Sequence, residues 1–237
     1  MYTRATGVEL WLFAAAALFL SGAPSALYVK LFAFEPPAPE AVLLVPVLLL
    51  MIGNVLVRMR AAMTGMIALW SWVALATLAC ASVAWSVSVA DTAREAAILL
   101  VGVVYLGMVA GIADWEELLA MLWRVCVALI ALSLILFFLV PDIGKMSDIY
   151  PGALSGPWFE KNATGQFFLW AGLVNYALLM VRPTRIVPAL AWTALIAVCL
   201  VMTESTTALL AFMVGTGALA LIVPLRRSFA VSLPALM

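Results

Sequence analysis

Long apolar runs, each about as long as a membrane-spanning helix, alternate with short polar breaks along this chain. A helix needs about 20 mostly apolar residues to cross a hydrocarbon core of about 30 Å. Runs of this kind lie near residues 10–29, 41–57, 62–84, 96–113, 118–140, 163–181, 186–202 and 207–224. The pattern predicts an all-α integral membrane protein with about eight transmembrane helices.

The last two runs form one apolar tract that only the residues TEST at 203–206 interrupt. A continuous helix over this tract, at about 1.5 Å per residue, would be nearly twice as long as the membrane core is thick. We therefore expect the tract to fold back at Glu204 as a helical hairpin. The first run follows Arg4 and precedes SGAPSA, so it also has features of a secretory signal. Because the other runs already commit the chain to the membrane, we interpret it as a span.

The composition agrees with a membrane protein, since 67% of the residues are hydrophobic and only 10% are charged. A soluble domain has roughly 45–50% apolar and about 25% charged residues. The 12 Lys and Arg balance the 12 Asp and Glu, so the net charge gives no indication of a nucleic-acid partner. The sequence contains no His, and its three cysteines are scattered singly in apolar runs. These features predict no metal site and no cofactor.

The orientation in the membrane can be predicted from the Lys and Arg residues of the short connections, which favour the cytoplasmic side. A cytoplasmic amino terminus places one group inside, namely Arg4, Arg58, Arg60, Arg124, Arg182, Arg185, Arg226 and Arg227. The group that then lies outside is half as large and contains Lys30, Arg94, Lys145 and Lys161. We therefore predict that the amino terminus is cytoplasmic.

The longest polar connection, residues 141–162, lies on the predicted outer side and is the only one large enough to hold a site. Its aromatic residues suit the headgroup region of a membrane. We found no repeat, low-complexity tract or soluble segment elsewhere, so residues 1–237 are predicted to form a single polytopic membrane domain.

Four polar residues stand where this connection meets the next apolar run: Glu160, Lys161, Asn162 and Gln166. Asn162 and Gln166 are four residues apart and would share a helix face beside the Lys161 ammonium. Such a cluster can bind a phosphate or a sugar hydroxyl. A structural explanation is equally open, because Lys can extend to the interface and Asn can cap a helix.

Three further candidates lie outside this connection. Arg94 is an outer cation at the start of the fourth run, where it could bind phosphate oxygens or pair with Glu95 or Asp91. Glu204 is a carboxylate at an apolar boundary, which is the kind of group that can act as a general base. Ser205 beside it could bind substrate, although Ser and Thr in such a turn often only cap a helix.

Three short motifs occur in a characteristic order: AWS followed by Arg94, then GPWFEKNATG at 156–165, then TESTTALLA at 203–211. Their order and spacing over residues 80–220 resemble the O-antigen ligase and polymerase superfamily. Within it, the exopolysaccharide-production polymerases are the most similar. Relatives often carry Arg or Lys where this chain has Thr206.

The resemblance implies a multi-pass enzyme of the bacterial inner membrane that takes a glycan from an undecaprenyl diphosphate carrier and joins it to a glycan or lipid acceptor in the periplasm. Family members are metal-independent, use outward arginines to bind the diphosphate, and usually supply a catalytic His from a large periplasmic loop. This sequence has no His. The final apolar residues, SFAVSLPALM, are too few to cross a bilayer. We expect them to begin a ninth span, so that the chain is either the amino-terminal part of a longer enzyme or a degenerate product that lost its catalytic half.

On this reading, Arg94 and Lys161 bind the donor diphosphate, Asn162 and Gln166 orient sugar hydroxyls, and Ser205 binds substrate, whereas the usual base lies outside this chain. Glu160 and Glu204 are the candidate catalytic carboxylates, and membrane lipid is the remaining partner. Two other functions stay open. A transporter or flippase would carry charged residues or broken helices near the membrane midplane. A non-catalytic scaffold of an assembly complex would need no His.

Overall fold

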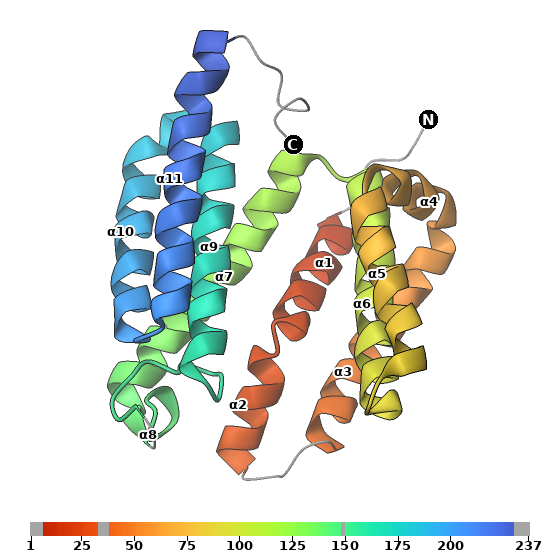
Figure 1. The fold of residues 1–237 in the computed structure, drawn as a ribbon, viewed down its shortest axis with the longest axis horizontal. Helices are drawn as coiled ribbons and strands as arrows, with labels where there is room; N and C mark the ends of the chain where they lie inside the picture. Colours follow the sequence, from red (N-terminus) through yellow and green to blue (C-terminus); the bar gives the residue numbers. More distant parts are fainter. Residues whose placement is uncertain (1–6, 33–37, 148–149, 230–237) are drawn as a thin grey trace. The chain divides into compact units, whose positions relative to one another are not determined.

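The computed structural model describes residues 7–32, 38–147 and 150–229 (Figure 1). Arg4 and the last residues of the predicted ninth span lie outside these ranges. Within them the chain is helical, and the only β-type pairing is an isolated bridge between Lys145 and Leu154. The helices are α1 (Gly7–Leu20), α2 (Ala23–Phe32), α3 (Ala38–Val57), α4 (Met59–Ala68), α5 (Trp70–Ser82), α6 (Val89–Ile112), α7 (Trp115–Leu139), α8 (Pro141–Gly144), α9 (Lys161–Val181), α10 (Ile186–Met202) and α11 (Thr206–Phe229).

Three of the described helices, α6, α7 and α9, are each long and apolar enough to cross a membrane. Up to five spans result if α1 with α2, and α3 with α4, each count as one broken span. The structure thus supports an all-α, membrane-type fold with three to five candidate spans. The count of eight and the cytoplasmic amino terminus stay predictions.

The predicted helix over 62–84 is wrong as a single element, because the chain changes direction at Leu69. The Leu69 N–H still donates to the Gly65 carbonyl, and the Trp72 and Val73 N–H groups donate to the Leu69 carbonyl. Backbone hydrogen bonding therefore continues almost unbroken through the bend. A hydropathy pattern records how apolar a run is and not its direction, so it cannot show such a break.

The first predicted span, 10–29, is also divided, at Ser21 and Gly22. Gly22 has a φ of 73°, a left-handed conformation that glycine adopts without steric cost. By contrast, the hairpin predicted at Glu204 is confirmed. α10 ends at Met202, α11 begins at Thr206, and Glu204 itself has a φ of 53°.

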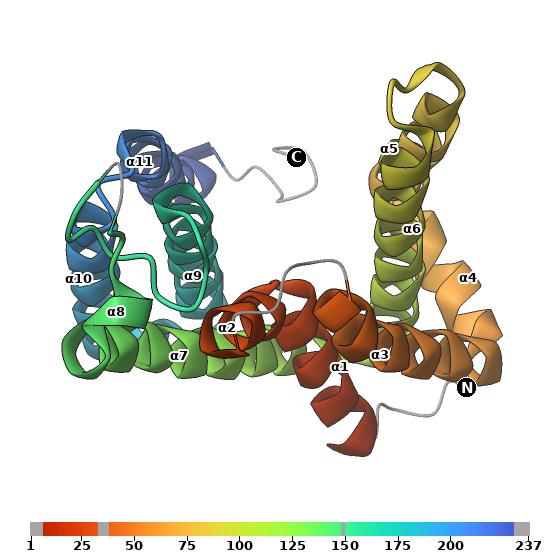
Figure 2. The ribbon, with the colours of Figure 1, turned by 90° about the horizontal axis from the view of Figure 1, so that it is seen from below.

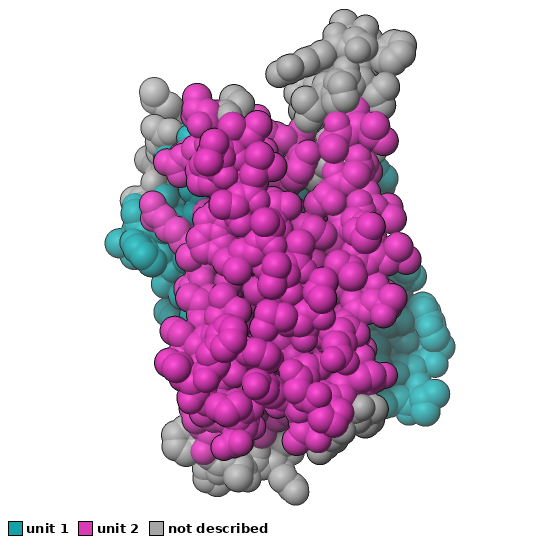
Figure 3. Space-filling model, turned by 90° about the vertical axis from the view of Figure 1, so that its left-hand side faces the viewer, with its two compact units in different colours: residues 1–20, 33–121 teal, residues 21–32, 122–237 magenta. Residues whose placement is uncertain are grey.

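The chain divides into two compact units, which Figure 3 distinguishes by colour. Unit 1 comprises residues 1–20 and 33–121, and unit 2 comprises residues 21–32 and 122–237, so the boundary falls within α7. The hydropathy pattern, which led us to expect one membrane domain over 1–237, contains no sign of this division.

Unit 1 is organised around close packing of α4 on α6. A Cβ atom added at Gly65 would lie 1.8 Å from the Gly107 carbonyl oxygen, and one added at Gly111 would lie 2.5 Å from the Ala61 carbonyl oxygen. Small residues four positions apart on both helices thus let the two backbones touch, as in many membrane helix pairs. An ion pair between Glu9 and Arg58, 2.8 Å long, joins α1 to the residue that caps α4.

Unit 2 is built around α9, which packs against both α10 and α11 (Figures 1 and 2). Apolar side chains of α7, α9, α10 and α11 meet in one core with Leu154 from the loop that precedes α9. The buried members of this core are Cys126, Ile130, Leu154, Phe168, Ala171, Ile196, Cys199, Leu200, Ala208 and Phe212. Leu154 is fully buried, so the loop is part of the core and not an appendage to it.

The predicted orientation can be tested by labelling single cysteines, introduced at positions 150, 184 or 204 of a chain in which the exposed Cys80 has been replaced. All three positions are exposed in the structure. We expect a membrane-impermeant thiol reagent to label positions 150 and 204 from the periplasm and to miss position 184. Labelling of position 184 alone from that side would invert the orientation.

Candidate functional site at one end of unit 2

The amino terminus of α9 and the turn between α10 and α11 lie at the same end of unit 2, together with α8 and the loop that leads to α9 (Figure 1). The two sequence motifs of the predicted outer face, GPWFEKNATG and TESTTALLA, occupy these two positions. The Lys161 ammonium donates a hydrogen bond of 3.1 Å to the Glu204 carbonyl oxygen. The Ser205 hydroxyl donates one of 3.0 Å to the Asn162 side-chain oxygen. Segments 43 residues apart in sequence therefore form one surface.

Glycines of the first motif allow this close approach. A Cβ atom on Gly165 would lie 2.9 Å from the Cβ atoms of both Ser205 and Ala208, so only glycine lets α9 approach the start of α11 so closely. Gly156 has a φ of 55°, and a Cβ there would lie 2.8 Å from the Ser133 hydroxyl oxygen. Both glycines are therefore needed by the backbone at this end of unit 2.

The loop before α9 is closely hydrogen-bonded to its neighbours. The Ser155 and Gly156 N–H groups both donate to the Gly144 carbonyl at 3.0 Å. The Leu154 N–H donates to the carbonyl of Met202, the last residue of α10, at 2.8 Å. The Thr164 hydroxyl, which is fully buried, donates to the Ser155 carbonyl at 2.6 Å. These bonds fix the loop against both the start of α9 and the α10–α11 turn.

Lys30 of α2 provides a second anchor for this loop. Its ammonium donates to the Ile143 carbonyl at 2.8 Å, to the Gly156 carbonyl at 3.0 Å and to the Ser155 hydroxyl at 3.2 Å. An ammonium has three N–H donors, so these partners account for all of them. Nearby, the indole N–H of Trp158 donates to the Ser21 carbonyl at 2.9 Å.

Lys161 places a positive charge at this end of unit 2. Its ammonium lies 3.0 Å from the centroid of the Tyr150 ring and donates to a neutral carbonyl. Among the described residues it has no carboxylate partner, so its charge is available to an anion. The side chains of Glu160 and Glu204 are exposed at the same end. The surface thus offers one half-buried cation, two carboxylates and an amide.

The structure brings together six of the seven predicted site residues and leaves one elsewhere. Lys161 and Asn162 contact the Glu204–Ser205 turn, and Glu160 directly precedes α9. Gln166 is exposed one turn further along α9 than Asn162. Ser205 is buried and hydrogen-bonded to Asn162, so in this conformation it supports the surface from beneath. Arg94 belongs to unit 1, where it is exposed and pairs with Glu95 at 2.9 Å.

Sequence reasoning missed the parts played by Lys30, Tyr150 and Thr164. The sequence places Lys30 on the predicted outer face and the aromatic residues of the connection in the headgroup region, and it gives Thr164 no role. The one signal available for Thr164 was its position inside the KNATG motif. The contacts of Lys30 and Tyr150 arise from tertiary packing and have no signature in the local sequence.

Within the described ranges, no group of three or more Cys, Asp or Glu residues is arranged so that it could hold a metal ion. In comparisons with protein-family models, with curated proteins and with solved structures, the chain matches none of them.

Proposed function

We propose that this chain takes part in sugar transfer from an undecaprenyl diphosphate carrier to a glycan or lipid acceptor at the periplasmic face of a bacterial inner membrane. The observation that carries the proposal is the direct contact between the two motifs through Lys161 with Glu204 and Asn162 with Ser205. A lysine that only extends to the membrane interface, or an asparagine that only caps a helix, would not need to contact the other motif, 43 residues away in sequence.

The reaction assigns a role to each exposed group. The glycosidic bond to the diphosphate breaks while the acceptor hydroxyl oxygen bonds to the same sugar carbon. The lipid diphosphate leaves, and the hydroxyl proton passes to a base. Lys161 would stabilise the charge that develops on the diphosphate. Asn162 and Gln166 would bind sugar hydroxyls, and Glu204 or Glu160 would accept the proton.

The test is turnover of an undecaprenyl diphosphate glycan by the full-length protein in proteoliposomes. We expect Lys161→Gln to lower the rate by about 10-fold to 100-fold, because it removes the cation that faces the leaving group. Lys161→Arg should retain part of the activity, since the charge persists while its geometry changes.

The matched control is Lys145→Gln, which removes an equal charge from the loop that precedes α9. The Lys145 ammonium lies 4.6 Å from the centroid of the Phe137 ring, and among the described residues it forms no hydrogen bond or ion pair with either motif. We expect this variant to be as active as the wild type. Equal activity of Lys161→Gln and the wild type at matched amounts of folded protein would remove Lys161 from the site.

A transporter of lipid-linked glycans is the second candidate, and one observation favours it. α3 and α4 are separated only by Arg58 yet turn through 97°, and discontinuous helices are common in transporters. Transport and transfer are distinguished by the product. A transporter would move labelled lipid-linked glycan between leaflets without lengthening it, whereas a transferase would yield a longer or relocated glycan.

A further inference from the structure

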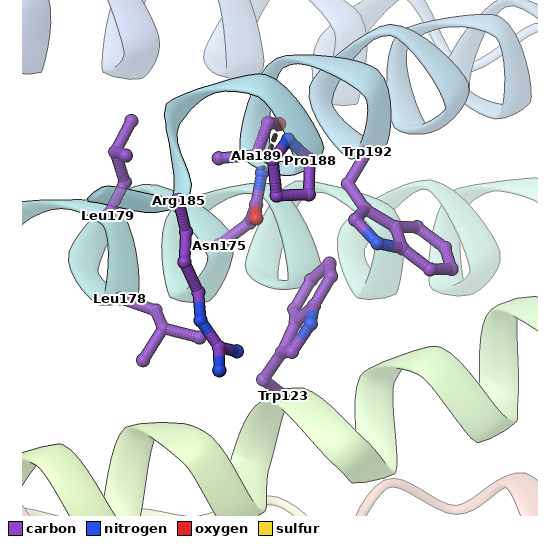
Figure 4. A pocket seen from close by; sticks show the side chains of 8 residues that line it. All are labelled: Trp123, Asn175, Leu178, Leu179, Arg185, Pro188, Ala189 and Trp192. Atoms are coloured by element: carbon purple, nitrogen blue, oxygen red, sulfur yellow. Dashed lines mark hydrogen bonds between the residues drawn. The ribbon is translucent and has the colours of Figure 1, made fainter. Parts of the chain in front are cut away.

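A small cavity lies at the opposite end of α9 from the motifs, where α9 ends and α10 begins (Figure 4). It encloses about 190 Å³ and is lined by side chains from α7, α9, α10 and the turn before α10. Cavities for drug-sized ligands usually enclose about 300–1,000 Å³. This cavity is smaller than that range, so it suits a headgroup or a similarly small part of a ligand and not a whole drug-sized molecule.

Two indole rings form one wall of the cavity. Trp123 of α7 and Trp192 of α10 pack edge to face, with ring centroids 5.2 Å apart and ring planes at 87°. Both side chains are partly buried. Tryptophan is typical of the level of a membrane at which apolar chains meet polar headgroups, because the ring is apolar and its N–H is polar.

Asn175 of α9 contributes an unused acceptor. It is 4% exposed, and its amide nitrogen donates both hydrogens, to the Ala189 carbonyl at 2.9 Å and to the Thr193 hydroxyl at 3.1 Å. The Thr193 hydroxyl in turn donates to the Ala189 carbonyl, so the orientation of the amide is fixed. Its oxygen has no hydrogen-bond partner among the described residues and lies on the cavity side in Figure 4.

Arg185 contributes a cation. Its exposed side chain extends across the cavity toward Trp123 and Leu178 in Figure 4. Within the described part of the chain, the guanidinium has no carboxylate partner. A guanidinium presents a planar set of donors that matches the oxygens of a phosphate group.

We propose that this cavity binds the headgroup of an anionic phospholipid whose phosphodiester carries a hydroxyl-bearing alcohol, as in phosphatidylglycerol. Arg185 donates to the phosphate oxygens, and the Asn175 oxygen accepts from the headgroup hydroxyl. The rings of Trp123 and Trp192 cover the adjoining carbon atoms. The turn that holds Arg185 is predicted to face the cytoplasm, where basic residues near a membrane attract anionic lipids. The proposal does not depend on the proposed sugar transfer.

The test is lipid retention by the purified full-length chain, measured by native mass spectrometry after exchange into defined vesicles. We expect phosphatidylglycerol to be retained more strongly than phosphatidylcholine. Phosphatidylmethanol, which has the same charge but no headgroup hydroxyl, should be retained several-fold less because the Asn175 oxygen is left without a donor. Arg185→Gln should weaken phosphatidylglycerol binding about tenfold, and Arg185→Lys should restore part of it.

The matched control is Arg182→Gln, which removes a cation from the same turn but not from the cavity lining. It should leave retention close to that of the wild type. Equal loss in both Gln variants would show general attraction to the surface and overturn the assigned site. Displacement of the lipid by inorganic phosphate at equal concentration would show a free-anion site and would also overturn the proposal. If Arg185→Gln does not fold, the wild type alone tests the proposal. Equal retention of phosphatidylglycerol and phosphatidylmethanol would then overturn it.

Discussion

A single methyl group added at Gly65 is expected to separate α4 from α6 and to unfold part of unit 1. In Gly65→Ala the new Cβ would lie 1.8 Å from the Gly107 carbonyl oxygen and 2.7 Å from its carbon. Both atoms belong to the backbone, so no side-chain rotation can relieve the clash. Overpacking usually costs about 1–3 kcal/mol, and a backbone clash belongs at or above the upper end of that range. Thermal unfolding in detergent would measure the loss.

The control for this prediction is Gly102→Ala in the same α6. A Cβ atom there meets nothing within 4 Å. Because alanine is the better helix former, this variant should be as stable as the wild type or more stable by up to about 1 kcal/mol. If the two alanine variants unfold at the same temperature, α4 and α6 do not approach as closely as the structure indicates.

The second large effect is expected at Lys30, in the variant Lys30→Met. Methionine is similar in length but has no N–H donor, so the Ile143 and Gly156 carbonyls and the Ser155 hydroxyl lose their shared partner. A polar group left without its partner in a buried place costs about 1–3 kcal/mol. We expect the loop before α9 to open about 30-fold more often, which corresponds to about 2 kcal/mol.

Amide hydrogen exchange can measure this opening at Ser155 and Gly156, whose N–H groups donate to the Gly144 carbonyl. Lys145→Met is the matched control, because it removes an equal charge from the loop itself without removing a side-chain hydrogen bond to it. Exchange in this control should stay slow. Unchanged exchange in Lys30→Met would mean that the backbone bonds hold the loop without help from α2.

Sequence patterns predicted the fold well where an apolar run is straight. The predicted run 163–181 lies inside α9, and the predicted turn at Glu204 separates α10 from α11. They failed at Leu69, because backbone hydrogen bonds continue through that bend and Leu69 itself stands within the apolar stretch MIALW at 66–70. The hydropathy pattern also could not predict the division into two units, because that division depends on which helices pack together.

The proximity of the two motifs could be predicted from the sequence, but the contacts between them could not. Motif resemblance placed Lys161, Asn162 and Ser205 in one group, and the structure shows two hydrogen bonds between the motifs. It could not predict that Ser205 is buried or that Lys161 lies over Tyr150. These details follow from the close approach of α9 and α11 at Gly165, which only a three-dimensional arrangement reveals.

The anchoring of α2 by the loop before α9 has a consequence for how the chain is made. The partners of the Lys30 ammonium lie 113 to 126 residues downstream in the sequence. At about 5–20 residues per second, a ribosome needs roughly 6–25 s to supply them after Lys30 has emerged. During that interval α3 to α7 are synthesised, and the ammonium must use acceptors other than its final partners, such as water or lipid headgroups. Native packing of α2 is therefore a late event in biogenesis, although α2 is among the first helices to leave the ribosome.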